Sequence, residues 1–261
     1  MSTQKRWNRG DFCWYELGTN DIDGAKRFYT SLFGWTTNDV PMGQMGIYSL
    51  FQHDGQDLGG MYKLEGPQFA GVPPNWAVYV AVDDVDADTA KARSLGATVL
   101  NEPMDVPNVG RISTIKDSQG AVISMYQAGD HPGAGRFENA SNTFCWSELM
   151  TKDPAGSTKF YTALFGWGTN VKEGGPMKYT EWTTNGCSIG GMLQITPEMG
   201  GVPPHWMNYL SVADCDATVA KAKQLGGKVQ LPPQDIPNVG RFSILADPQG
   251  AFFSVIKLTH K

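Results

Sequence analysis

Histidine and cysteine are scarce in this sequence, with four residues of each among 261. The cysteines, Cys13, Cys145, Cys187 and Cys215, form no CxxC pair, which argues against a zinc knuckle or a thioredoxin-type motif. Cys13 and Cys145 both stand in the sequence Phe-Cys-Trp. We expect them to be buried thiols that pack as small apolar groups, as is usual in a reducing cytoplasm.

The sequence also lacks what a membrane protein or a nucleic-acid-binding protein needs. No apolar run approaches the ~20 residues that cross a bilayer, and the first residues have no apolar core typical of a signal peptide. The net charge is -5 and the basic residues are scattered, whereas phosphate binding requires a clustered basic face. Because 41% of the residues are hydrophobic, we expect a folded cytoplasmic protein that binds neither nucleic acid nor membrane.

What the sequence does contain is an internal repeat. Residues 12–38 read FCWYELGTNDIDGAKRFYTSLFGWTTN and residues 144–170 read FCWSELMTKDPAGSTKFYTALFGWGTN, with 17 of 27 positions identical at an offset of 132. Later landmarks recur in the same order, among them Val-Pro-Pro-x-Trp, Pro-Asn-Val-Gly-Arg and Gln-Gly-Ala. A unit of ~120 residues is too long for a solenoid repeat and has the size of an independent domain.

The repeat predicts a first domain at residues 10–128 and a second at residues 142–258. Residues 129–141 between them are rich in glycine, proline and small polar residues, which is typical of a linker. The alternative is that this segment packs on the domains as an ordered strap. Because the chain carries its own duplicate, we expect a monomer with pseudo-dimeric symmetry or a homodimer.

Within each copy, one pattern of secondary structure occurs twice. Residues 12–17 alternate as a strand does, and an apolar stripe at helical spacing follows, with Asp21 or Asn20 as its N-cap and Gly34 as its end. Asp84 or Asp86 can cap a second helix in the same way. Strand-like runs complete the copy at residues 35–38, 46–52, 57–62, 77–82, 97–100, 111–116 and 121–126. The whole chain therefore reads as strand–helix–three strands, four times over.

This βαβββ module resembles that of the vicinal oxygen chelate superfamily, which includes glyoxalases, bleomycin-resistance proteins and extradiol dioxygenases. Asp21 followed by Phe28-Tyr29 and Leu32-Phe33-Gly34-Trp35 is similar to its first helix. Asp247-Pro248-Gln249-Gly250 is similar to its terminal hairpin, and Asp117-Ser118-Gln119-Gly120 is a variant of it. The resemblance covers nearly the whole chain and is closest to tandem glyoxalase-like proteins of bacteria. It implies an α+β fold of four βαβββ modules, paired into two domains whose cup-shaped mixed sheets bind ligands inside the cup.

The resemblance also implies where a metal would bind, and this sequence departs from the family there. The metal enzymes place a His seven residues before the helix-capping Asp, a His on the first strand of the next module, and a Glu four residues after the hairpin glycine. In this sequence, the residues at those positions are Trp14 and Trp146, Ala77 and Met207, and Ser124 and Ser254. Among them only a serine hydroxyl could ligate a divalent first-row metal, and only weakly, so we expect no cofactor.

Strand alternation places a carboxylate beside each of these tryptophans. Trp14 and Glu16 share one face of the first strand, as do Trp146 and Glu148, and in the family that face carries the ligands. A glutamate in an aromatic strand is costly to bury without a partner. Glu16 and Glu148 are therefore candidates for a general base or a ligand anchor. The alternative is that each braces the sheet through hydrogen bonds.

The remaining candidates are two arginines and two methionines. Arg111 and Arg241 enter the strands that pair with those of Ser124 and Ser254, where a guanidinium could hold a glutamate ionised or bind an anionic substrate. The alternative is an arginine that closes the Val-Gly-Arg turn. Met61 and Met192 follow paired glycines and are candidates to line the cup, although a methionine serves equally well in a core.

These residues leave more than one function open. We favour a bleomycin-resistance-like protein that binds a small organic molecule in an aromatic cup without a metal. The close alternative is a glyoxalase-like lyase or isomerase that uses Glu16 or Glu148 for proton transfer. A metal-dependent dioxygenase is disfavoured because its two-histidine, one-carboxylate ligand set is missing. A role in binding partners without catalysis stays a further alternative, since fold does not decide function.

Overall fold

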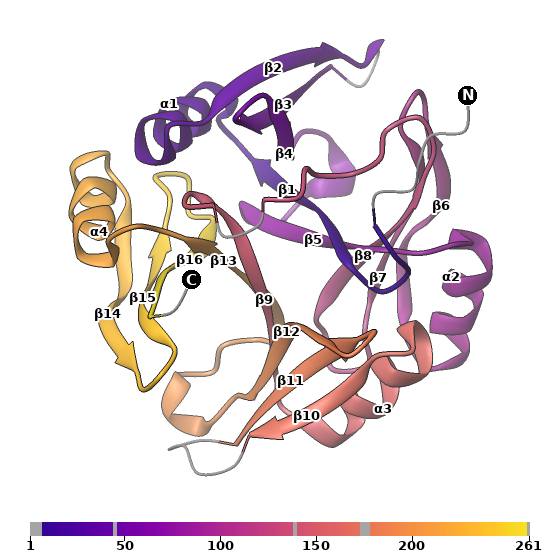
Figure 1. Cartoon of the computed structure of the whole chain (residues 1–261). Coiled ribbons are helices and arrows are strands. Elements are labelled where there is room, and N and C mark those ends of the chain that lie inside the picture. The colour runs from indigo at the N-terminus through magenta and orange to yellow at the C-terminus, as the bar shows by residue number, and fades with distance from the viewer. Residues whose placement is uncertain (1–6, 44–45, 138–139, 173–177, 260–261) are drawn as a thin grey trace. The chain divides into compact units, whose positions relative to one another are not determined.

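The computed structural model describes residues 7–43, 46–137, 140–172 and 178–259 (Figure 1). The elements of the first half are β1 (Phe12–Thr19), α1 (Ile22–Phe33), β2 (Thr36–Pro41), β3 (Ile47–His53), β4 (Gln56–Lys63), β5 (Asn75–Ala81), α2 (Val85–Ser94), β6 (Thr98–Val106), β7 (Gly110–Lys116) and β8 (Val122–Ala128). Those of the second half are β9 (Thr143–Thr151), α3 (Pro154–Phe165), β10 (Gly168–Lys172), β11 (Tyr179–Thr184), β12 (Cys187–Gln194), β13 (His205–Ser211), α4 (Cys215–Gln224), β14 (Lys228–Ile236), β15 (Gly240–Ala246) and β16 (Phe252–Leu258). The expected order of strand, helix and three strands is confirmed in all four modules.

Each main helix begins at an aspartate that the sequence marks. The Asp21 carboxylate accepts a hydrogen bond from the Gly24 amide, and Asp84 does the same for the Ala87 amide. Such a cap satisfies one of the amides that the first turn of a helix leaves without a partner. Helix α1 ends at Gly34, whose φ of 74° lies in the left-handed region that glycine adopts most easily. The expected cap and end of this helix are confirmed.

The strands form two eight-stranded mixed sheets, one from each half of the sequence. Their strand orders are β2-β3-β4-β1-β5-β8-β7-β6 and β10-β11-β12-β9-β13-β16-β15-β14, so both halves repeat the same topology. The expected α+β class, with four βαβββ modules in two tandem sheets, is confirmed. Strand β6 is longer than the expected run at residues 97–100. Register shifts after Val99 and Asn101 accommodate Pro103, and the strand continues beyond them.

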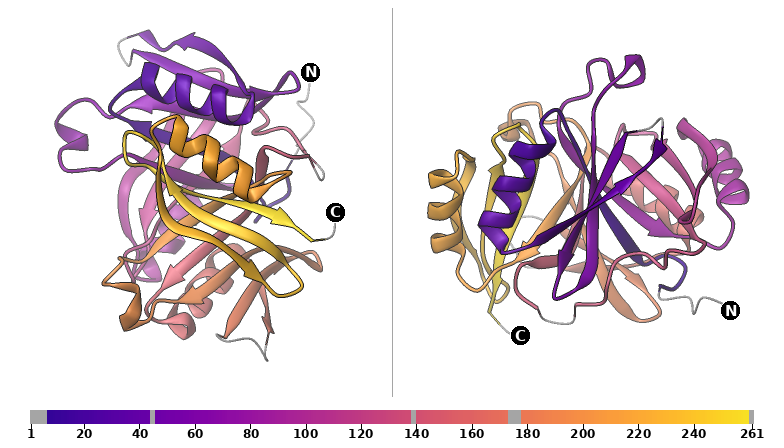
Figure 2. Two further views of the ribbon diagram at one scale, coloured as in Figure 1. Left: turned by 90° about the vertical axis from the view of Figure 1, so that its left-hand side faces the viewer. Right: turned by 90° about the horizontal axis from the view of Figure 1, so that it is seen from above.

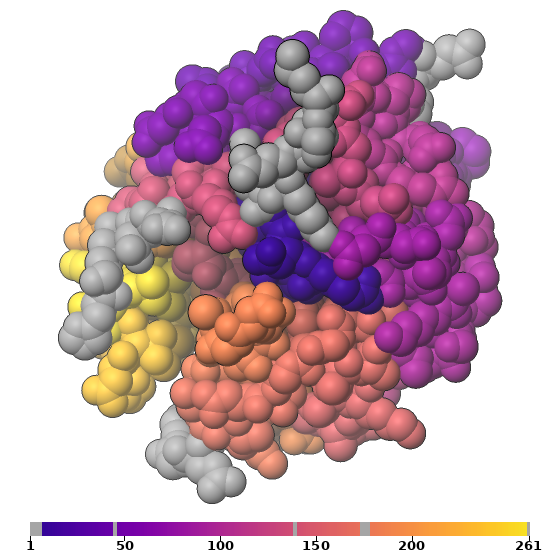
Figure 3. All heavy atoms as spheres, turned by 45° about the vertical axis from the view of Figure 1, so that its right-hand side comes forward, coloured from indigo at the N-terminus to yellow at the C-terminus, as the bar shows by residue number. Residues whose placement is uncertain are grey.

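The residues also group into two compact units, and each unit draws on both halves of the sequence. Among the described residues, one unit contains residues 7–14, 77–133, 146–172 and 178–207, and the other contains residues 15–43, 46–76, 134–137, 140–145 and 208–259. In the second unit, α1 and α4 lie side by side (Figure 2), and the Lys221 ammonium donates a hydrogen bond to the Leu32 carbonyl. In the first unit, the first described residues (indigo in Figure 3) lie against salmon and orange residues of the second half, and the Trp167 indole donates to the Gly10 carbonyl at 2.8 Å.

Each unit contains a buried series of hydrogen bonds from a tryptophan to a tyrosine and from that tyrosine to an aspartate. In the second unit the Trp76 indole donates to the Tyr29 hydroxyl at 2.8 Å, and this hydroxyl donates to the Asp247 carboxylate at 3.0 Å. In the first unit Trp206, Tyr161 and Asp117 repeat the arrangement. Each aspartate belongs to a terminal hairpin and each tyrosine to the first helix of the other half. The aspartates of the two hairpin motifs therefore bind modules that are far apart from them in the sequence.

The segment between the halves is held by backbone hydrogen bonds where it is described. The His131 amide donates to the Val109 carbonyl at 3.1 Å, and the Gly135 amide donates to the Asp57 carbonyl at 2.7 Å. These hydrogen bonds attach His131 and Gly135 to the first half of the chain, and the division into linker and domains stays a prediction. Among the described residues, no helix is long and apolar enough to cross a membrane.

Candidate functional site

A tyrosine–glutamate pair occurs at equivalent positions in the two halves. In the first half, the Tyr48 hydroxyl of β3 donates a hydrogen bond of 2.7 Å to Glu16 Oε1 of β1. In the second half, the Tyr179 hydroxyl of β11 donates one of 2.7 Å to Glu148 Oε2 of β9. We call the side of each sheet that carries this pair the glutamate face. The sequence marked both glutamates but neither tyrosine.

Glycine makes these pairs sterically feasible. Strand β4 lies between β3 and β1, so the Tyr48 side chain must cross it to reach Glu16. Gly60 pairs with Glu16, and a Cβ atom placed there would lie only 2.0 Å from the Tyr48 hydroxyl oxygen. At Gly191 the corresponding distance to the Tyr179 hydroxyl is 1.9 Å. The paired glycines of the sequence were the signal that a large side chain from a neighbouring strand lies above them.

The electrostatics of the second pair are well defined. Burial and the charge of Glu148 raise the pKa of Tyr179 far above its usual range, so its hydroxyl stays protonated. The Trp146 indole donates to the Tyr179 oxygen at 2.9 Å, and the tyrosine proton therefore points toward Glu148. The Glu148 side chain is buried, at 8% exposure. In the first half, burial and Glu16 raise the pKa of Tyr62, which lies on the same face.

The opposite side of the sheet packs against the helix and contains the methionines. Phe51 contacts Tyr29 of α1, and Met61 shares the face of Phe51 because Ser49 pairs with Met61 and Phe51 with Gly59. Met61 is fully buried, and Met192, at 2% exposure, lies on the corresponding face beside Trp182. The expectation that these methionines line the cup is therefore not met, because strand alternation turns them toward the core.

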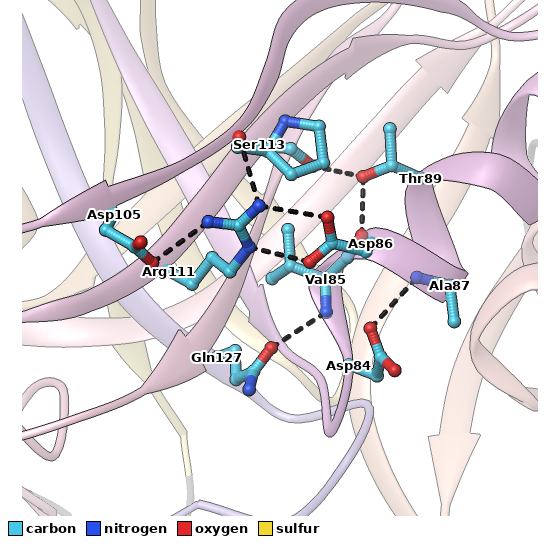
Figure 4. A network of polar contacts seen from close by, with 10 residues as sticks. Asp84, Val85, Asp86, Ala87, Thr89, Asp105, Arg111, Ser113 and Gln127 are labelled. Atoms are coloured by element: carbon cyan, nitrogen blue, oxygen red, sulfur yellow. Dashed lines mark hydrogen bonds and ion pairs between the residues drawn. The ribbon is translucent and has the colours of Figure 1, made fainter.

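Both candidate arginines form ion pairs with aspartates of their own modules, as Figure 4 shows for Arg111. Arg111 donates from Nε to Asp86 at 2.6 Å and from Nη1 to Asp105 at 3.0 Å. These ion pairs raise the pKa of Arg111 and lower that of Asp86. Arg241 repeats the arrangement with Asp216 and Asp235. The arginines therefore bind aspartates and not the glutamates that the sequence suggested, and their role in binding an anionic substrate stays a prediction.

Of the remaining candidates, Ser124, Ser254 and Trp14 are buried, and Trp146 is half-buried. Ser124 exchanges a hydrogen bond of 2.9 Å with Thr114, which faces it across β7 and β8. In the second half Ile244 occupies the position of that threonine, and the buried Ser254 hydroxyl has no hydrogen-bond partner within the described part of the chain. The Trp14 ring, at 8% exposure, meets the His131 ring edge-on with centroids 5.1 Å apart.

The donor set does not suit the metal that the fold family implies. At the family's ligand positions stand two tryptophans, Ala77 and Met207, and two serines. Within residues 7–43, 46–137, 140–172 and 178–259, no three His, Cys, Asp or Glu side chains are grouped so that they could hold a metal ion. We therefore derive no chemical step through a metal.

Comparison with known proteins places the chain in a family. The model of the glyoxalase/bleomycin resistance protein/dioxygenase superfamily matches residues 12–125 and 143–255. The chain belongs to this superfamily. It is 40% identical to CFP32 of Mycobacterium tuberculosis, provisionally named a glyoxylase, over 98% of both chains. It is 34% identical to the anthracycline biosynthesis protein DauV of Streptomyces sp. strain C5, over 97% of this chain and 95% of that protein.

Solved structures show the same fold at low sequence identity. The Mn(II)-bound glyoxalase of Novosphingobium aromaticivorans matches with a TM-score of 0.64 at 17% identity, covering 96% of this chain and 83% of that one. The 2,2',3-trihydroxybiphenyl 1,2-dioxygenase of Sphingomonas wittichii RW1 matches with a TM-score of 0.63 at 14% identity, covering 96% and 91%.

Proposed function

We propose that the glutamate faces bind a small organic molecule and that Glu16 and Glu148 accept hydrogen bonds from it, without the superfamily's usual metal. The observation that carries this proposal is the pair of tyrosine-bound glutamates at equivalent positions, Tyr48 with Glu16 and Tyr179 with Glu148. A carboxylate offers about four acceptor positions, so one that binds a tyrosine can still accept a ligand hydroxyl.

The surroundings favour a flat ligand with donor groups. Trp14 and Trp146 each lie two residues before a glutamate, on the same side of the strand. An indole supplies a rigid apolar surface for an aromatic ring, and the carboxylate fixes the orientation of the ring through its hydroxyls. The relationship to an anthracycline biosynthesis protein supports the same ligand class, because anthracyclines are flat, hydroxylated aromatic compounds.

A specific observation also supports a second candidate, a glyoxalase-like lyase or isomerase. Glu148 is a buried carboxylate that a neutral tyrosine holds in position, and a positioned carboxylate is a common general base. In this reaction Glu148 or Glu16 would remove a proton from the carbon next to a substrate carbonyl. The protonated tyrosine would keep the carboxylate in place. The relative provisionally named a glyoxylase supports this candidate.

The test compares Glu16→Gln, Glu148→Gln and the double variant with the wild type. Glutamine keeps the shape of the side chain but removes its charge and basicity. Isothermal titration calorimetry with daunorubicin measures binding, and disappearance of the hemithioacetal of methylglyoxal and glutathione measures catalysis. Glu65→Gln is the matched control, because the side chain of Glu65 is 72% exposed.

Binding should weaken about tenfold in each single variant, as expected for a lost hydrogen bond to a charged group, and should stay level in the control. A lost general base would instead lower turnover by about 100-fold or more. If all Gln variants bind and turn over like the wild type but unfold more easily, the glutamates brace the sheet and the proposal is wrong.

A further inference from the structure

The two glutamate faces differ at one position that lies opposite the glutamate. Gly60 pairs with Glu16 on one side and with Leu50 on the other. Gly191 pairs with Glu148 on one side and with Glu181 on the other. Each face therefore carries a row of three positions across three strands. The row reads Glu–Gly–Leu in the first half and Glu–Gly–Glu in the second.

Polar side chains surround Glu181 on this face. Its carboxylate accepts hydrogen bonds from the Ser188 hydroxyl at 2.8 Å and from the Asn170 amide at 3.3 Å. The Lys172 ammonium lies 3.3 Å away and offsets the charge, while the Glu181 side chain keeps 21% exposure. In the first half, the residue that pairs with Tyr48 is Val40, whereas Lys172 pairs with Tyr179. The second face is therefore polar where the first is apolar.

We propose that this position determines what each face selects, an inference that rests on the proposed function. The second face takes a flat molecule with hydrogen-bond donors at both ends, one for Glu148 and one for Glu181. The first face takes a flat molecule with a donor at the end near Glu16 and an apolar end near Leu50.

The spacing suits a ligand of two fused rings that lies on the Tyr179 side chain, because this side chain crosses Gly191 between the two glutamates. Neighbouring strands lie about 4.8 Å apart, so the backbone positions of Glu148 and Glu181 are separated by roughly 10 Å. A ligand without a donor at the Glu181 end would cover a carboxylate and leave its lost hydration uncompensated, which the site penalises. Because Lys172 already offsets the charge of Glu181, the matching group is a neutral hydroxyl and not a cation.

The test uses calorimetry with 2,6-dihydroxynaphthalene and with 2-naphthol, which lacks the second hydroxyl. The variant Glu16→Gln weakens binding to the first face about tenfold, so that the second face dominates the titration, and Glu148→Gln makes the first face dominate. In the Glu16→Gln background, the dihydroxy compound should bind about tenfold more tightly than 2-naphthol. In the Glu148→Gln background this preference should be absent.

Exchange of the residues at positions 50 and 181 should transfer the preference for 2,6-dihydroxynaphthalene over 2-naphthol from one face to the other. Glu181→Leu in the Glu16→Gln background should abolish it, and Leu50→Glu in the Glu148→Gln background should create it. If Glu181→Leu does not fold, Glu181→Gln keeps the shape and should still reduce the preference. An equal preference in both backgrounds, or one that survives every change at position 181, overturns the inference.

The two proposals fail in different ways. If the affinity for both naphthols depends on Glu16 or Glu148 but does not change with the residue at position 181, only the inference about selectivity is wrong. If neither naphthol nor daunorubicin binds the wild-type protein, the proposed function fails, and the selectivity of its two faces fails with it.

Discussion

Replacement of Gly191 by alanine tests the geometry of the second tyrosine–glutamate pair directly. The new Cβ atom would lie 1.9 Å from the Tyr179 hydroxyl oxygen and 3.0 Å from the Trp146 indole nitrogen. The first distance is sterically impossible and the second is tight, so the tyrosine must move away and lose both hydrogen bonds. Because Gly191 carries no unusual backbone conformation, the clash alone decides the outcome.

The magnitude follows from what is lost and what is gained. The hydrogen bond to the charged Glu148 contributes about 1.5–3 kcal/mol and the neutral one from Trp146 about 0.5–1.5 kcal/mol, whereas alanine in a strand regains about 0.5–1 kcal/mol of backbone entropy. Gly191→Ala should therefore lower the free energy of unfolding by about 1–4 kcal/mol. Chemical denaturation followed by far-UV circular dichroism measures this change, and near-UV dichroism follows Trp146 and Tyr179.

A double-mutant cycle isolates the cause. The variant Tyr179→Leu removes the ring that crosses Gly191, so the added Gly191→Ala should then be neutral or stabilising by about 0.5 kcal/mol. Gly60→Ala with Tyr48→Leu provides the matched cycle in the first half. Equal destabilisation by the alanine in both backgrounds would refute the view that glycine serves to let the tyrosine pass.

Three further outcomes are expected. Tyr29→Phe should destabilise the protein by about 1.5–3 kcal/mol in denaturant titrations, because Asp247 loses a buried donor, and an unchanged midpoint would contradict this. Burial raises the pKa of Asp247, so its contribution to stability is present below its ordinary pKa and lost as pH rises through the raised one. In Asp247→Asn, the melting temperature should no longer fall over this pH range as it does in the wild type. If the melting temperatures of the variant and the wild type change in parallel with pH, this expectation is wrong. Elemental analysis of protein purified without chelator should find no stoichiometric Zn, Ni, Mn or Fe, whereas one equivalent lost on replacing Ser254 would overturn that expectation.

Local signals in the sequence were enough to predict the modules. Asp21 and Gly34 mark a helix through short-range rules, since a carboxylate caps free amides and glycine adopts positive φ. The repeat then extended the interpretation to all four modules. Strand alternation also placed Glu16 and Glu148 on one face with their tryptophans, because the period of a strand is two residues.

Interactions between distant segments could not be predicted in this way. The sequence left Met61 equally suited to line the cup or to pack in the core, and only the register with Ser49 shows that it faces the helix. Arg111 was considered for Glu16, but a fold was needed to bring it to Asp86, 25 residues earlier in the chain. The choice between partners of similar chemistry depends on distance, and distance is set by packing.

The sequence by itself determined the duplicated βαβββ modules, the helix caps and the two glutamates, since each depends on neighbours along the chain. The tertiary structure alone decided that Tyr48 crosses Gly60 to reach Glu16 and that Tyr179 repeats this in the second half. It also decided that each terminal hairpin aspartate binds the helix tyrosine of the other half. The physical reason is that strand order and module packing bring together residues whose separation in the sequence carries no local signal.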